Sequence, residues 1–219
     1  MLIQSQLPEG VTLLGALISS DKITISAMMG NQVAHLLLIS LVDITMDFQM
    51  KTSNHTFILF ALLPVPKFLY KNRKICGVLE DCLVHECIDY IMKPLKKAAE
   101  IGIMMSDLVS WCRYCFMPLV GAIMDTPKAL LYAGITPKIS PVTMATYKQF
   151  GDSFQHEPWM VSTTLAQLME VEVAADPWDF ASYLPNVKQF CLNGVHRPFW
   201  RDWLLAEPLL FLTPKPLYH

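Results

Sequence analysis

The chain has 219 residues, of which 53% are hydrophobic and 16% charged, and its formal net charge is −2. The length suits one domain with a sizeable core, or one and a half, and the charge by itself gives no electrostatic case for nucleic-acid binding. No apolar stretch approaches the roughly 20 residues that a membrane-spanning helix needs, and the segment 1–9 lacks the pattern of a secretory signal. We therefore expect an intracellular protein without a membrane span.

The first half of the chain predicts strands followed by one long helix. Three β-favouring apolar runs with short connections indicate an antiparallel meander. These runs cover 11–19, 36–44 and 57–65. From 78 to 101 the apolar period becomes helical, and Pro94 inside it predicts a kink or two shorter helices. A fourth strand is expected at 103–106, directly before Asp107.

The order of elements suggests a fold class. We expect a helix at 116–124 and a fifth strand at 129–133, which completes the order β-β-β-α-β-α-β. This is the succession of the RNase H-like fold, an α/β fold with a mixed sheet in which the first and fourth strands lie side by side. The match is an analogy at the level of the fold and carries only that weight.

Regular periodicity fades after Gly134. The segment 134–158 is rich in Thr, Ser, Pro and Gln, and a helix is expected at 162–173. The remainder is dense in Trp and Pro and predicts irregular chain with short helices. We therefore expect an RNase H-like catalytic-core part at 1–135, followed by an insertion and an incomplete C-terminal part at 136–219.

Two aspartates at predicted strand ends are the candidate catalytic and metal-binding residues. Asp21 follows the first strand and Asp107 the fourth. Paired carboxylates on neighbouring strands can hold Mg²⁺ for phosphoryl transfer, but this chemistry needs a third acidic ligand. An isolated aspartate at a strand end is also a common turn residue, and that alternative stays open. The string Asp125-Thr126-Pro127 is interpreted as a helix cap or turn.

The six cysteines do not show the paired spacing of a structural zinc site. Cys112 and Cys115 form a single CxxC, and Cys82, His85 and Cys87 cluster upstream. A structural zinc site usually needs two ligand pairs at this spacing. We expect buried, reduced thiols and no zinc.

Longer strings of residues indicate a family. Together they resemble the Plavaka-type transposases of fungal CACTA-like DNA transposons, in order and nearly without gaps from about residue 10 to 219. The strings are ISSDK at 18–22, MKTSNH at 50–55, ALLPVPK at 61–67, RYCF at 113–116, SPVT at 140–143, YKQFGD at 147–152, STTLAQL at 162–168 and NGVHRPFWRDW at 193–203.

The resemblance implies an RNase H-like enzyme of the DDE type that cuts and rejoins DNA at the ends of a transposon. It implies Asp21 and Asp107 as ligands of Mg²⁺, DNA as the partner, and a nuclear location. It leaves the oligomeric state open.

The departures from the family pattern predict an inactive protein. Lys215 stands in place of an acidic residue, and the downstream block that should supply the third carboxylate does not follow. Several residues, Lys128 and Trp159 among them, differ from the family pattern by substitutions that a single C-to-T change on one DNA strand can produce. This indicates a decaying transposon copy. We therefore expect a truncated, degenerate, catalytically inactive transposase copy. The alternatives are a domesticated module that binds DNA or protein, and a residual metal-dependent DNA-cleaving enzyme.

Overall fold

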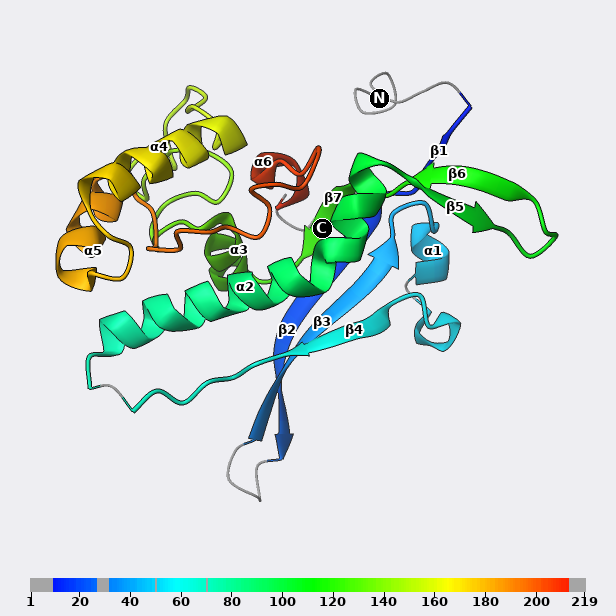
Figure 1. Cartoon of the computed structure of the whole chain (residues 1–219), viewed down its shortest axis with the longest axis horizontal. Coiled ribbons are helices and arrows are strands. Elements are labelled where there is room, and N and C mark those ends of the chain that lie inside the picture. The colour runs from blue at the N-terminus through cyan, green and yellow to red at the C-terminus, as the bar shows by residue number, and fades with distance from the viewer. Residues whose placement is uncertain (1–9, 27–31, 50, 70, 213–219) are drawn as a thin grey trace.

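A four-stranded mixed sheet forms the centre of the molecule in the computed structural model, which describes residues 10–26, 32–49, 51–69 and 71–212 (Figure 1). Its strand order is β4-β3-β2-β7. The strands are β2 (Ala16–Ser26), β3 (Gln32–Leu41), β4 (Ile58–Leu63) and β7 (Leu119–Ile123). The first three pair antiparallel, which confirms the predicted meander, and β7 pairs parallel with β2.

Alternating side chains place one face of this sheet in the core. Ile18 on β2, Leu37 on β3 and Ala122 on β7 are all buried, and they belong to the same hydrophobic cluster. Strand β2 does not end at Asp21, as the sequence suggested, but continues to Ser26, because its polar second half keeps pairing with β3.

A second sheet contains β1 (Thr12–Leu13), β6 (Cys112–Phe116) and β5 (Ile103–Ser106), in that order. The strand predicted at 103–106 therefore exists, but its neighbour is β6 and it takes no part in the central sheet. The hairpin of β5 and β6 projects from one end of the molecule, opposite the end where the C-terminal helices lie (Figure 1).

The long helix α2 (Arg73–Glu100) crosses the central sheet as one uninterrupted helix (Figure 1). The side chain of Asn72 caps its N-terminus by accepting a hydrogen bond from the Lys74 N–H, 3.0 Å away. Pro94 lies inside the helix without dividing it, so the alternative of two shorter helices is wrong. Burial of Met92 and Lys96 on either side of the proline holds the helix in place.

Two predicted elements were assigned the wrong type. The segment 116–124, expected to be helical, contains β7, and the segment 129–133, expected to be a strand, lies in helix α3 (Thr126–Ala133). Pro118 and Gly121 disfavour a helix in the first segment, and pairing with β2 favours a strand. In the second, the Asp125 cap and the early Pro127 begin a helix.

The C-terminal region is more regular than its composition suggested. It contains α4 (Val161–Ala174), which confirms the helix predicted at 162–173, α5 (Phe180–Gln189) and the short α6 (Pro208–Phe211). A short helix α1 (Met46–Gln49) and a 3₁₀ turn (Thr52–Asn54) lie between β3 and β4. Among the helices of the described residues, none is both long enough and apolar enough to cross a membrane.

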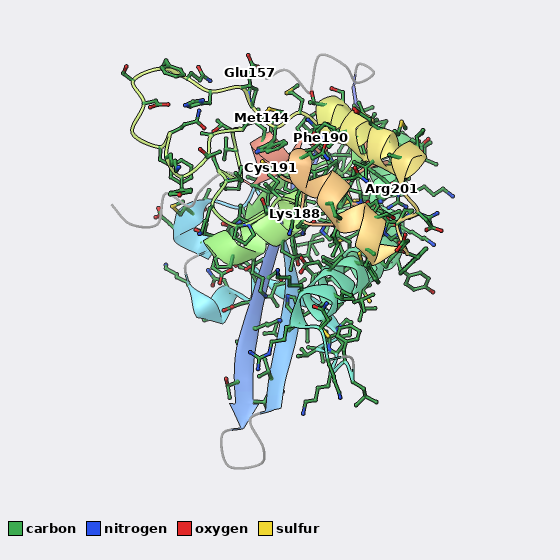
Figure 2. The ribbon with its side chains drawn as sticks, turned by 90° about the vertical axis from the view of Figure 1, so that its left-hand side faces the viewer. Met144, Glu157, Lys188, Phe190, Cys191 and Arg201 are labelled. Atoms are coloured by element: carbon green, nitrogen blue, oxygen red, sulfur yellow. The ribbon has the colours of Figure 1, made fainter. Side chains whose placement is uncertain are left out.

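Segments from both halves of the chain close around one core. Tyr132 from the first predicted part contacts Phe199 from the second, with ring centroids 5.5 Å apart. Figure 2 shows the end of α5, at Lys188, Phe190 and Cys191, where the Cys191 carbonyl accepts a hydrogen bond from the Thr136 N–H at 2.9 Å. The hydrophobic cluster thus spans both parts, and the boundary at 135/136 stays a prediction.

The loop before α4 is closed by backbone pairing. The Met144 N–H donates to the carbonyl of Glu157, 2.7 Å away, and both residues are labelled on this loop in Figure 2. Trp159 then anchors the end of the loop in the core, and its ring N–H donates to the Ser140 carbonyl at 3.0 Å. This region is ordered by its own contacts and packs beside the sheet.

Candidate functional site

Asp21 lies in the middle of β2 with an exposed side chain. Its antiparallel partner on β3 is Leu36. The residues on either side of it point to the other face, where Ser20 is buried and Lys22 reaches helix α2. The sequence prediction for this residue is therefore right in placing it on the first strand of the meander and wrong in placing it at the strand's end.

The strand beside Asp21 is β7, and it leads directly to Asp125. The parallel register between the two strands ends at the pair Ser19 and Ile123. Two residues further along each chain lie Asp21 and Asp125, and the backbone of Asp125 is still extended. Residues at the same level of neighbouring parallel strands point to the same side, so continuing this register past the end of β7 puts Asp21 and Asp125 at the same level.

Asp125 also begins helix α3. Its Oδ1 atom accepts a hydrogen bond from the Lys128 N–H at 3.0 Å, which fixes the carboxylate at the N-terminus of the helix. A negative charge is favoured there by the orphan N–H groups and the helix dipole. The sequence interpretation of Asp125 as a cap is confirmed, and the position of β7 gives this residue a second neighbour, Asp21.

Asp107 lies elsewhere. It occupies the turn between β5 and β6, where its Oδ1 atom accepts hydrogen bonds from the N–H groups of Val109 and Trp111, both at 3.0 Å. Arg113 lies 3.9 Å from its other oxygen. Because β5 pairs with β6 and β2 pairs with β7, the structure does not bring Asp107 beside Asp21. The geometry shows a residue that holds its own hairpin turn.

Two lysines and a histidine lie on the sheet face opposite the Asp21 side chain: Lys22 and His35 are cross-strand partners there, and Lys128 reaches His35. Lys22 forms an ion pair with Glu80 of α2, with 2.6 Å between nitrogen and oxygen. The Nζ atom of Lys128 lies 2.8 Å from Nε2 of the buried His35 on β3. The Lys128 ammonium is also within electrostatic range of both Asp21 and Asp125.

The contacts of His35 define its protonation state. The Ser20 hydroxyl lies 2.9 Å from the same Nε2 atom, and a charged Lys128 can only donate to it, which favours a neutral ring with its proton on Nδ1. Burial, reinforced by the charge of Lys128, lowers the pKa of His35 to about 4. Burial also lowers the pKa of Lys128. In the described part of the chain, Nδ1 of His35 has no hydrogen-bond partner.

These residues do not fit a two-metal centre. Carboxylate oxygens suit Mg²⁺, but two-metal catalysis needs further anionic ligands around both ions. Glu80, a carboxylate of α2, is engaged by Lys22, and the buried Lys128 lies within electrostatic range of Asp21 and Asp125. Within the described ranges, no three His, Cys, Asp or Glu side chains are grouped so that they could hold a metal ion.

The cysteines that were considered as possible zinc ligands lie apart from this site. Cys112 and Cys115 are three positions apart on β6, so they face opposite sides, the first exposed and the second buried. Cys82 on α2 borders a pocket of about 800 Å³, with its sulfur 3.9 Å from Nδ1 of His196. Burial raises the pKa of the Cys82 thiol to about 11, which makes it a poor nucleophile.

The fold and the site together define a mixed α/β protein in which β7, parallel to β2, leads to Asp125 at the level of Asp21. A family model described as Plavaka transposase matches residues 1–219, the whole chain, and the chain belongs to that family. Comparison with curated proteins and with solved structures gives no match. The family assignment confirms the resemblance seen in the sequence, and it implies DNA binding and metal-dependent DNA cleavage in general terms.

Sequence reasoning missed four residues of the site: Asp125 as a partner of Asp21, and Glu80, His35 and Lys128. For Asp125 a signal was present. The run Leu119–Ile123 contains β-branched residues and follows a proline, which favours a strand, and the aspartate comes two residues after it. The other three reach the site by long-range packing, for which the local sequence gives no sign.

Proposed function

We propose that this protein is derived from a DDE-type transposase, that it keeps an RNase H-like core, and that it does not cleave DNA. The observation that carries the proposal is the arrangement of the central sheet. Three antiparallel strands are followed by a helix and then by a strand parallel to the first, and this last strand leads to Asp125 beside Asp21. The ancestral carboxylate pair on this proposal is Asp21 and Asp125, which replaces the pair predicted from the sequence.

The charges at the site support the loss of cleavage. Phosphoryl transfer by two metal ions depends on carboxylates that remain available to both ions. Here one nearby carboxylate, Glu80, is held by Lys22, and the ammonium of Lys128 lies within range of the other two. A divalent cation entering this site meets positive charge that is already in place.

DNA is the proposed partner, on the strength of the family, and a nuclear location follows from it. A net charge of −2 means that any contact with phosphate must use a local basic surface. Four exposed basic residues precede and begin α2, namely Lys67, Lys71, Arg73 and Lys74. This segment favours a second candidate function, a DNA-binding module without catalysis.

A cleavage assay tests the first proposal. Purified protein is incubated with a DNA duplex and Mg²⁺ or Mn²⁺, alongside the variants Asp21→Ala and Asp125→Ala. We expect no cleavage above the background of the two variants. Cleavage by the wild type that either variant abolishes would overturn the inactive assignment.

Binding is measured separately from cleavage. We expect affinity for duplex DNA to fall as the salt concentration rises, and to fall further in a variant with Lys71, Arg73 and Lys74 replaced by Gln. A variant with Lys138 and Lys148 replaced by Gln, two exposed lysines in the loop before α4, is the matched control. Equal losses in both variants would remove the basic segment as the binding surface.

A further inference from the structure

We propose that the pocket bordered by Cys82 binds an organic cation, that is, an ammonium or guanidinium group carried on an apolar body. The pocket has a volume of about 800 Å³, which is of the size that proteins use for small ligands. None of the residues that line it belongs to the Asp21 site or is one of the four basic residues proposed to contact DNA. The pocket is therefore a site separate from the function proposed above.

The walls of the pocket come from parts of the chain that are far apart in the sequence. One face of the first half of α2, within 79–86, forms part of the wall, together with Phe68 ahead of the helix. The rest comes from Glu172 near the end of α4, the segment 177–178 before α5, and the segment 196–197. Figure 1 shows the start of α2, α4 and α5 at the same end of the molecule. The tertiary structure thus builds the pocket, and α2 and α4 fix its walls.

Aromatic rings give the pocket a surface that attracts cations. Trp178 and Phe68 both line it, and both are exposed to solvent. The ring of Trp178 packs edge-on against that of His196, with centroids 5.2 Å apart and an angle of 70° between the planes. This contact holds the indole in place. The faces of aromatic rings carry partial negative charge, and tryptophan binds an ammonium or guanidinium group best among the aromatic side chains.

Two carboxylates in the same pocket have no partner. Glu86 and Glu172 both line it, and neither forms an ion pair or a hydrogen bond within the part of the chain that the structure describes. Arg197 also lines the pocket without pairing with either of them. Burial lowers the pKa of His196, whose ring is therefore neutral at neutral pH and adds no charge. Two glutamates against one arginine leave the pocket with an excess of negative charge.

A cation on an apolar body is the ligand that satisfies both features of the pocket. An anion such as phosphate would meet two carboxylates and the negative faces of the rings, with Arg197 alone in its favour. A neutral apolar molecule would gain from the rings and nothing from the carboxylates. If the glutamates were only solvated surface charges, the pocket would not distinguish a cation from a neutral molecule of the same shape. That difference is measurable.

The experiment compares choline with the neutral alcohol in which a carbon atom replaces its nitrogen. Dissociation constants for the whole chain are measured by saturation-transfer NMR, and we expect choline to bind about tenfold more tightly. A blocked pentapeptide with one central lysine, compared with its norleucine counterpart, tests a protein side chain as the source of the cation. The cation with the larger preference over its neutral counterpart identifies the source. Equal binding within both pairs would overturn the proposal.

Substitutions of the glutamates locate the binding. Glu86→Gln combined with Glu172→Gln should abolish the preference for choline over the alcohol. The matched control combines Glu100→Gln with Glu170→Gln, which removes one exposed glutamate from α2 and one from α4, both outside the pocket. This control should keep the preference. An equal loss in the two double variants, or no loss in the first, would overturn the proposal.

The aromatic wall is tested in the same way. Trp178→Leu should weaken choline binding about tenfold. Trp111→Leu, at an exposed tryptophan directly before β6, should leave it unchanged. Because both side chains are exposed, we expect both variants to keep the wild-type melting temperature, which shows that they are folded. Unchanged choline binding in folded Trp178→Leu, or the same loss in Trp111→Leu, would contradict the assigned pocket.

Discussion

The ring of His85 on α2 accepts a hydrogen bond at Nδ1 from the backbone N–H of Phe199, 3.1 Å away and 114 residues further along the chain. Its other nitrogen, Nε2, donates to the carbonyl of Leu131 at the end of α3, at 2.9 Å. One neutral imidazole therefore joins three segments, and the ring also contacts those of Tyr132 and Phe199. Both hydrogen bonds require the neutral form, because a protonated ring has no acceptor.

This contact predicts a loss of stability in mild acid. Burial lowers the pKa of His85 to about 4, below the unfolded value of 6.5. Between these two pH values His85 is protonated in the unfolded chain and neutral in the folded one. The contribution is fully present above the unfolded pKa and is lost as the pH falls from 6.5 toward about 4. Between about pH 7 and pH 5 we expect His85 to account for about 2 kcal/mol of lost stability.

A variant isolates this contribution. Burial raises the pKa of Asp81 to about 7, which acts with the opposite sign over the same range, and the lowered pKa of His35, about 4, acts with the same sign, so the wild-type profile alone combines these effects. His85→Asn keeps an acceptor for the Phe199 N–H but does not titrate. In this variant, the loss of unfolding free energy between pH 7 and pH 5 should be smaller than in the wild type by about 2 kcal/mol. Urea unfolding at each pH gives this difference, and an unchanged difference would contradict the assignment.

Lys96 should be a strong determinant of stability. Its ammonium group contacts both Asp89 on the same helix and Asp202 in the C-terminal segment, and Lys96 and Asp89 are buried. Arg201 also donates to Asp89, at 2.8 Å. Lys96→Met removes one cation from a buried carboxylate and should cost roughly 3 kcal/mol in urea unfolding. Lys97→Met, at the next and exposed position, should change stability by less than about 0.5 kcal/mol.

Trp200 should be intolerant of replacement. Its ring is 1% exposed and its Nε1–H donates to the carbonyl of Tyr132 at 2.8 Å. Trp200→Phe leaves a cavity and an unsatisfied carbonyl, with an expected cost of about 3 kcal/mol. Trp178, which is 64% exposed, provides the matched control, and Trp178→Phe should stay within about 0.5 kcal/mol of the wild type. Similar costs for the two variants would contradict the observed packing.

Replacing Gly102 and Gly77 by alanine should change the stability of the protein in opposite directions. Gly102 has a φ of +72°, and a Cβ atom there would lie 2.5 Å from the Tyr114 ring, so Gly102→Ala should lower the melting temperature, at a cost of about 2 kcal/mol. Gly77 lies inside α2 with nothing within 4 Å of the added atom. Gly77→Ala should therefore stabilise the protein by about 0.5–1 kcal/mol. Two changes of the same sign would refute the conformations seen at these positions.

Local patterns predicted much of the fold because they depend on neighbouring residues. The meander, the long helix and the helix at 162–173 all follow from apolar periodicity and caps, and the structure contains each of them. Pro94 does not divide α2 into two helices, so of the two outcomes predicted for it, a kink or two shorter helices, the second is wrong. The segments 116–124 and 129–133 were assigned the wrong type because the pairing of β7 with β2 and the cap at Asp125 outweighed a weak local preference.

The sequence by itself determined the family, the sequence of apolar runs and the place of Asp21 on the first strand of the meander. Only the tertiary structure decided which later strand lies beside it. The runs at 103–106 and 119–123 are both short, apolar and close to an aspartate, and nothing local distinguishes their partners. Parallel pairing joins segments about a hundred residues apart, so it depends on long-range packing that no local pattern encodes. That choice brings Asp125 to the level of Asp21 and leaves Asp107 to close a hairpin turn.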